Sequence, residues 1–246
     1  EFNVGIGNNV MDAAMNGANY NTAVGYDALT DLTTGDYNVS IGSRSGSSLT
    51  TGHQNVFVGD YAGNNTADVG FATVVGHGAL AGVATDAADG AVAIGIEALS
   101  VLTTGAGSTA VGRNAGQYTT TGSNNTFLGY EAGTGINGAR LTGDGNTAVG
   151  KDAGILLQGA AAYNTVLGGL SGGNITTGSH NIFLGYSAGN HTVNTSTGIR
   201  NLLIGSYSDT SANDSSYQIA IGYDCSGNQD NGTVIGSAGI FQFASK

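Results

Sequence analysis

Apolar residues recur in this chain as short triplets at a period of about 17 residues. Three units run back to back: NTAVGYDALTDLTTGDY from Asn21, NVSIGSRSGSSLTTGHQ from Asn38 and NVFVGDYAGNNTADVGF from Asn55. Each begins with Asn at position one and has an aliphatic residue at position four, Gly at position five and a small residue at position eight. Self-similarity at a fixed short period is typical of repeat arrays, so the pattern predicts a solenoid.

Fourteen units of this kind follow one another along the chain. They start at Asn3, Asn21, Asn38, Asn55, Ala72, Ala91, Ser108, Asn125, Asn146, Asn164, Asn181, Asn201, Gln218 and Gly232. Most are 17 residues long, and the extra residues of the longer ones follow the strand-like part, where connectors tolerate insertion. We therefore predict an all-β, parallel β-roll or β-solenoid of about 14 coils, forming a single repeat domain over residues 1–246.

Both faces of each predicted strand are apolar. Position four is Ile, Val or Leu in every unit, and position two is β-branched in all but one, where it is Leu202. These two positions share one face of a strand, and we expect that face to form the core. Position three points the other way and is also mostly apolar, as at Ala23 and Phe57. A strand that is apolar on both faces is typically buried on both.

A single 17-residue coil has one interior, which accounts for only one of these faces. Phe57, between Val56 and Val58, is then expected to have no dry environment within one chain. The face of position three should instead pack against another copy of the chain. The pattern thus predicts a homo-oligomer.

Asn at position one and Gly at position five are expected to be structural. Stacked coils place equivalent Asn side chains above one another, where they can form a hydrogen-bonded ladder, weaker across residues 72–124, which lack the Asn. The Gly supplies a positive φ or a close approach of neighbouring backbones. The clearest structural positions are Asn21, Gly25, Asn38, Gly42, Asn55, Gly59, Asn125, Gly129, Asn146, Gly150, Asn181 and Gly185.

In the units from Asn21 to Gln218, position eight is Ala, Ser or, once, Cys225, which predicts a tight corner that admits one small side chain. We therefore expect Cys225 to be a packed residue rather than a reactive thiol.

Composition narrows the possible partners. Forty-four glycines without a Gly-X-Y period exclude collagen, and the absence of proline argues against a disordered linker. A net charge of −11 with only six Lys and Arg leaves no basic stripe for nucleic acid. No apolar run approaches the ~20 residues that span a bilayer, so we expect no membrane insertion by this segment. Since Glu1-Phe2-Asn3 already enters the repeat, we expect a fragment without a signal peptide.

Catalytic and cofactor motifs are not predicted. Residues 145–151 read GNTAVGK, but the phosphate-loop motif requires Ser or Thr next, where this chain has Asp152. The histidines (His53, His77, His180 and His191) lie in distant units without metal-ligand spacing and are expected in solvated turns. No Ser-His-Asp or paired-carboxylate arrangement recurs at matched positions, so we expect no enzyme, no cofactor and no metal site.

The longer connectors and a set of tyrosines are the candidate binding surfaces. The connectors span residues 81–90, 134–145, 190–200 and 209–218, and insertions on a repeat rod usually map to one face. Four tyrosines follow the position-five Gly and should form an aligned row: Tyr26, Tyr130, Tyr186 and Tyr223. Tyr beside Asp, Glu or Asn suits carbohydrate stacking and hydrogen bonding, although covering corners or packing between chains is the favoured interpretation.

The order Asn-x-x-aliphatic-Gly, Ala-Gly, Thr-Thr-Gly resembles the head repeats of trimeric autotransporter adhesins (YadA-like heads). It is equally similar to repeats of phage tail fibres and of fibre proteins of predatory bacteria. The best matches are NTAVGYDAL from Asn21, NTFLGYEAG from Asn125, NTAVGKDAG from Asn146 and NIFLGYSAG from Asn181. The resemblance implies a left-handed parallel β-roll with three chains around a common axis, located at a cell surface or in a virion tail fibre.

Four functions follow as hypotheses. The first is a structural and adhesive segment of a trimeric extracellular fibre, with a host or prey surface glycan or protein as receptor. The second is the shaft or receptor-binding region of a phage tail fibre. The third is a monomeric ice-binding solenoid, suggested by the many threonines but disfavoured because those at position two are interrupted by Val and Ile and are expected on the core face. The fourth is a glycan depolymerase.

Overall fold

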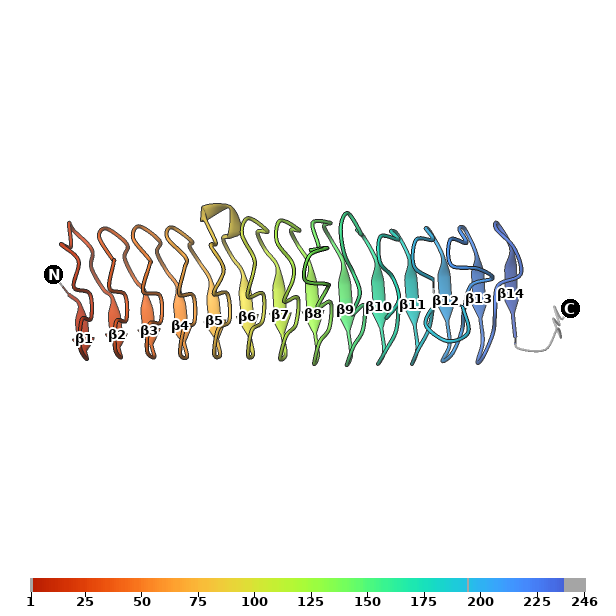
Figure 1. Ribbon diagram of the computed structural model, residues 1–246, viewed down its shortest axis with the longest axis horizontal. Coiled ribbons are helices and arrows are strands. Elements are labelled where there is room, and N and C mark those ends of the chain that lie inside the picture. The colour runs from red at the N-terminus through yellow and green to blue at the C-terminus, as the bar shows by residue number, and fades with distance from the viewer. Residues whose placement is uncertain (1, 194, 237–246) are drawn as a thin grey trace, which may run out of the picture.

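The computed structural model describes residues 2–193 and 195–236, which form one elongated stack of coils (Figure 1). Each coil contributes one three-residue strand. The strands are β1 (Val4–Ile6), β2 (Thr22–Val24), β3 (Val39–Ile41), β4 (Val56–Val58), β5 (Thr73–Val75), β6 (Val92–Ile94), β7 (Thr109–Val111), β8 (Thr126–Leu128), β9 (Thr147–Val149), β10 (Thr165–Leu167), β11 (Ile182–Leu184), β12 (Leu202–Ile204), β13 (Ile219–Ile221) and β14 (Thr233–Ile235).

The strands form one sheet in which every strand is parallel to its neighbours and their order follows the sequence. Equivalent positions pair throughout, as Thr22 pairs with Val39 and Val24 with Ile41. The register persists across the longest unit, because Thr126 pairs with Thr147 although 21 residues separate them. The predicted parallel β-solenoid of about 14 coils is confirmed.

The prediction of which face is the core was wrong. Position three points into the coil: Phe57 is fully buried within the single chain, as are Phe127 and Phe183. Positions two and four point outward, so that Val56 on one side of Phe57 is 37% exposed. The interior of one coil is therefore large enough to take a phenyl ring, and the face that is left uncovered is that of positions two and four.

Glycine at position nine makes room for the phenylalanines. A Cβ at Gly63, in the same coil as Phe57, would lie 2.8 Å from its ring, and one at Gly46, in the preceding coil, 2.7 Å from it. In the coil of β2 the sizes are exchanged, with Ala23 at position three and Leu29 at position nine, both fully buried. The two positions thus share one interior volume, as close packing requires.

Glycine at position five allows the coils to approach one another. Gly25 has a φ of +147°, and a Cβ on it would lie 2.2 Å from the carbonyl oxygen of Gly42 in the next coil. The same contact recurs between successive position-five glycines, which confirms the predicted close approach.

The predicted asparagine ladder is also present, in two segments. Asn38 donates its side-chain amide to the side-chain oxygen of Asn21 at 3.0 Å and to the main-chain oxygen of Gly52 at 3.0 Å. Equivalent side-chain bonds join Asn3, Asn21, Asn38 and Asn55, and then Asn125, Asn146, Asn164, Asn181 and Asn201. Position one is Ala72, Ala91 and Ser108 between these segments, so the ladder is interrupted where we expected it to be weak.

The remaining coil corners follow the same logic. Position eight is buried, at Ala28 and Ala62 for example, as its small residues predicted. Cys225 is 1% exposed there, and burial raises the pKa of its thiol, in agreement with a packed residue. The connector over residues 81–90 contains a single helical turn, η1 (Asp86–Ala88), which projects from the stack (Figure 1). Among the described residues, no helix has the length and apolar character needed to cross a bilayer.

Candidate functional site

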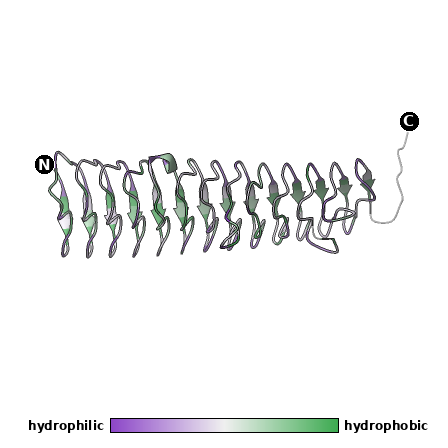
Figure 2. Cartoon of the chain, turned by 45° about the horizontal axis from the view of Figure 1, so that its top comes forward, coloured by the Kyte–Doolittle hydropathy of each residue, from purple (hydrophilic) through white to green (hydrophobic). Residues whose placement is uncertain are grey.

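The outward side of the strands forms a uniform surface along the described chain. We call it the outer strand face and define it as positions two and four of the 14 units. All of its 28 residues are Val, Ile, Leu or Thr, and none is charged. Figure 2 shows the hydrophobic strands following one another along the rod. At a spacing of about 4.8 Å between strands, the face is on the order of 65 Å long.

Exposed apolar side chains gather on this face and at its margins. They occupy positions two, four and six or directly precede position one, with Val83 as the exception: Phe2, Val4, Ile6, Tyr20, Tyr26, Tyr37, Ile41, Val56, Phe71, Ile96, Leu128, Tyr130, Tyr163, Leu167, Ile182, Tyr186, Tyr217, Tyr223 and Ile235. Contiguous apolar patches larger than a few hundred Å² are rare on soluble monomers and mark interaction surfaces. The outer strand face is therefore a candidate interface.

The second-position threonines belong to this face and not to the core, which corrects our sequence interpretation. Thr109, Thr126, Thr147 and Thr165 stand in four successive coils, and each is half-buried or exposed. Our expectation that these threonines are buried, and for that reason cannot bind ice, was wrong. Position four still has no threonine in any coil, so the face carries no Thr-x-Thr pairs.

The four tyrosines predicted to form a row all lie exposed at position six but do not form one continuous surface. Tyr26 is in the coil of β2 and Tyr130 in the coil of β8, and no tyrosine occupies the same position in the coils between them. Tyr186 and Tyr223 are linked through Tyr207, whose ring centroid is 5.5 Å from that of Tyr186 and 5.7 Å from that of Tyr223. Sequence reasoning missed Tyr207 because it occupies position seven.

Tyr130 lies instead between two cations. The guanidinium carbon of Arg113 is 5.9 Å from its ring centroid and the ammonium nitrogen of Lys151 is 5.8 Å from it. A hydrogen bond with Glu131 raises the pKa of the Tyr130 phenol. Lys151 also lies 3.3 Å from the carboxylate of Asp152. Lys151 is thus paired with a carboxylate, and the contacts of Arg113 and Lys151 with the Tyr130 ring join successive coils.

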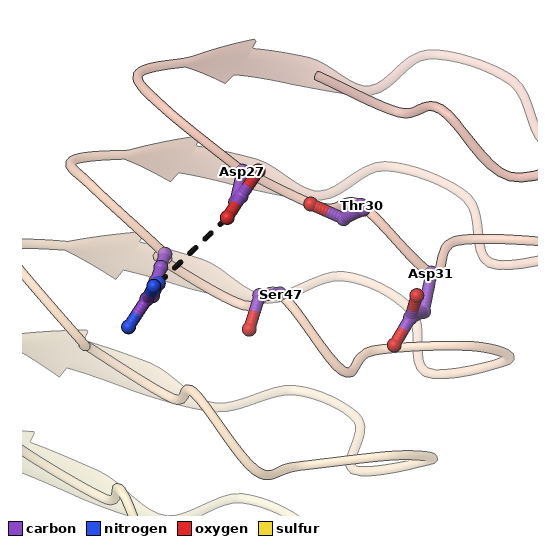
Figure 3. A pocket seen from close by; sticks show the side chains of 5 residues that line it. Asp27, Thr30, Asp31 and Ser47 are labelled. Atoms are coloured by element: carbon purple, nitrogen blue, oxygen red, sulfur yellow. Dashed lines mark ion pairs between the residues drawn. The ribbon is translucent and has the colours of Figure 1, made fainter. Parts of the chain in front are cut away.

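A shallow hollow of ≈ 220 Å³ lies between the coils of β2 and β3, lined by Asp27, Thr30, Asp31, Arg44 and Ser47 (Figure 3). The carboxylate of Asp27 is 3.7 Å from the guanidinium of Arg44 and accepts a hydrogen bond from Asn9 at 3.0 Å. Arg44 donates in turn to the phenol oxygen of Tyr61, 2.5 Å away.

The two hydroxyl groups of the hollow are engaged in the same way. The hydroxyl of Thr30 donates to the main-chain oxygen of Asn9 at 3.2 Å, and that of Ser47 donates to the side chain of Asn64 at 2.6 Å. Most polar groups of the hollow are therefore committed to bonds between coils. These bonds support a structural role for the hollow.

Other motifs of the sequence take structural roles. Residues 147–149 of the GNTAVGK segment form β9, so this segment is a strand and not a loop around a phosphate. The four histidines are exposed, as predicted, and Tyr163 packs beside His180 with ring centroids 5.1 Å apart. In the described part of the chain, no group of three or more His, Cys, Asp and Glu is placed to hold a metal ion.

A buried carboxylate organises the connector over residues 190–200. Asp209 is fully buried, and its Oδ2 accepts hydrogen bonds from the main-chain N–H groups of Thr192 and Val193, both at 2.7 Å, and from the Thr192 hydroxyl at 3.2 Å. Burial raises the pKa of Asp209, although these bonds act in the opposite direction. The connector is therefore anchored at its first turn, where His191 lies.

Comparison with known proteins adds no assignment: no protein-family model matches the chain, and no curated protein matches it.

Proposed function

We propose that this chain is a structural and adhesive segment of a trimeric extracellular fibre. The observation that carries the proposal is the outer strand face, an uncharged apolar surface running the length of an in-register parallel solenoid. A surface of this size needs a cover in water. Covering it with further copies of the chain yields a long, stiff rod of the kind from which fibres are made.

A second copy fits this face better than an unrelated partner does. Its strands repeat at the same ~4.8 Å spacing, so a parallel copy in register can match the face coil by coil. The absence of charge at positions two and four means that such packing leaves no charge buried and unpaired. The likeness of the repeat to trimeric adhesin heads favours three copies around one axis and a left-handed coil.

The experiment is a mass measurement in solution combined with a cell-binding assay. A trimer of the folded chain that binds whole cells supports both parts of the proposal. A stable monomer would refute the fibre trimer, and a trimer that binds neither cells nor isolated surface components would reduce the segment to a spacer.

The shaft or receptor-binding region of a phage tail fibre is the alternative with the same architecture. The neighbouring coding sequences discriminate between the two: a tip or chaperone domain downstream favours the tail fibre, and a coiled coil with an outer-membrane anchor favours the adhesin.

Ice binding is a second candidate because of one observation, the outward threonines at Thr109, Thr126, Thr147 and Thr165. Regular hydroxyls on a flat sheet suit a monomer whose face is open to solvent. Val and Ile interrupt the threonine series at other coils, and position four has none, so we favour the fibre. Thermal hysteresis from a monomeric preparation would reverse this preference.

A further inference from the structure

We propose that Tyr186, Tyr207, Tyr223 and His191 form a binding platform for a neutral saccharide near the C-terminal end of the described chain. We call these four residues the aromatic platform. The proposal deepens the adhesive part of the proposed function, on which it rests, by assigning a site and a class of ligand.

Tyr207 is the centre of the platform. Its ring centroid lies 5.5 Å from that of Tyr186, 5.7 Å from that of Tyr223 and 4.8 Å from that of His191. The two tyrosine pairs are nearly perpendicular, at 80° and 87°, in the edge-to-face geometry that aromatic rings prefer. Four rings from three coils and one connector therefore form one contiguous surface.

The platform is exposed at its two ends. Tyr223 is 67% exposed and Tyr186 48% exposed. Gly169 lies in the coil before Tyr186, and a Cβ at this position would be 3.5 Å from the Tyr186 ring. Because glycine has no side chain, residue 169 leaves that side of the ring uncovered. Within the described residues, none of the three phenol hydroxyls donates to or accepts from another protein group. The rings thus offer both an apolar surface and free hydroxyls.

The main chain holds the platform in place. The main-chain N–H of Tyr207 donates to the carbonyl oxygen of Tyr186 at 2.9 Å. The main-chain N–H of Asp224 donates to the carbonyl oxygen of Ser206, also at 2.9 Å. The connector that carries His191 is fixed by the buried carboxylate of Asp209 through Thr192. The insertion that lengthens this unit therefore adds one ring at a fixed position, which fits the rule that insertions on repeat rods build binding faces.

Polar groups flank the rings. Nε2 of His191 lies 3.8 Å from a carboxylate oxygen of Asp224, whose side chain is 57% exposed. A carboxylate accepts hydrogen bonds from sugar hydroxyls, while the phenol and imidazole groups can donate to or accept from them. The C–H face of a pyranose can lie on the rings at the same time, since tyrosine combines an apolar body with a polar tip.

The same geometry argues against other ligands. The tyrosine rings contact one another at centroid separations of 5.5–5.7 Å, so no space remains between them for a quaternary ammonium group. The net charge of −11 and the nearby Asp224 carboxylate disfavour acidic sugars. Three coils span about 10 Å along the rod, which suits a ligand of two or three sugar units.

The test is ligand-observed NMR of the full chain with lactose and maltose as neutral probes and sialyllactose as the charged comparator. We expect neutral probes to bind in the millimolar range, about 10⁻³ M, as a shallow surface site implies. Tyr223→Ala and Tyr207→Ala should weaken this binding about three- to tenfold, because each removes a stacking surface. Tyr26→Ala is the matched control: it is exposed at the same position of its unit but outside the platform, and should bind as the unaltered chain does.

Three outcomes would overturn the platform: binding of sialyllactose alone, absence of binding to all three probes, and equal losses in Tyr26→Ala and Tyr223→Ala. Measuring the solution mass and the whole-cell binding of the same variants distinguishes failure of the platform proposal from failure of the proposed fibre function. If the unaltered chain and Tyr223→Ala are both trimers and bind cells equally well, only the platform is refuted. If the chain is a monomer that binds no cells, the proposed function is refuted.

Discussion

The side-chain oxygen of Asn21 accepts two hydrogen bonds from Asn38, one from its main-chain N–H at 2.9 Å and one from its side-chain amide at 3.0 Å. One residue of each coil therefore fixes the position of the next coil. Since both residues are buried, the bonds form away from water, where an unpaired amide is costly.

Replacement of Asn164 by Ala should destabilise the stack by about 2–4 kcal/mol. The change removes bonds from its amide to Asn146 and Gly178 and leaves two donors of Asn181 without their acceptor. Urea unfolding measures the effect. Asn137→Ala, an exposed asparagine of a connector, is the control and should change stability by less than about 0.5 kcal/mol.

Gly42→Ala should prevent correct stacking and cost more than about 3 kcal/mol, because the added Cβ would lie 2.3 Å from the carbonyl oxygen of Gly59. Gly90→Ala separates this clash from backbone strain. It also has a positive φ, +73°, but a Cβ there meets nothing within 4 Å, so only the ~1–2 kcal/mol strain remains. Equal losses in the two variants would show that the coils do not approach as described.

Phe57→Ala tests the corrected orientation of the strands. The ring is fully buried inside its own coil, so its loss should leave a cavity and cost about 3–5 kcal/mol. The oligomeric state of the folded protein should stay the same, since Phe57 does not lie on the outer strand face. If the variant remains stable but dissociates, position three lies between chains after all.

The pKa of Asp209 is raised by burial, and this predicts the sign of a pH dependence. The folded chain binds the proton more tightly than the unfolded chain, so the contribution is fully present below about pH 4, the ordinary pKa of aspartate, and is lost as the pH rises through the raised pKa. Asp209→Asn is neutral at every pH. The unfolding free energy of the unaltered chain minus that of the variant should therefore fall on raising the pH from 3 to 7. The fall should be about 1.4 kcal/mol for each pH unit that separates the folded and unfolded pKa values of Asp209. A difference that grows with pH would contradict the raised pKa.

Much of the architecture could be predicted from the sequence because it depends on repeated local chemistry. The Asn and Gly positions, exemplified by Asn146 and Gly150, predicted the ladder and the close approach of coils, and both are present. Alternation alone could not decide which strand face is interior, since both are apolar. The deciding signal was a compensation in size between positions three and nine. Phe57 occurs with Gly63, whereas Ala23 occurs with Leu29, and residues compensate in this way only when they share one volume.

The candidate site was less predictable because it joins different positions of the repeat. Tyr186 and Tyr223 were expected from their common place after the Gly, and both are exposed. Tyr207 and His191 reach them from position seven and from an inserted connector. The approach of His191 depends on how Asp209 folds that connector, which a repeat pattern does not encode.

The central claim is that copies of this chain cover the outer strand face, and sedimentation equilibrium of the folded chain tests it most directly. We predict a mass of about 73 kDa, three times the 24.3 kDa of one chain. Charges placed on the face by Leu128→Glu together with Leu167→Glu should reduce it to that of the monomer while the fold persists, because both side chains are nearly half exposed in the single chain. A folded, unaltered chain that sediments as a 24.3 kDa monomer at micromolar concentration would contradict the account.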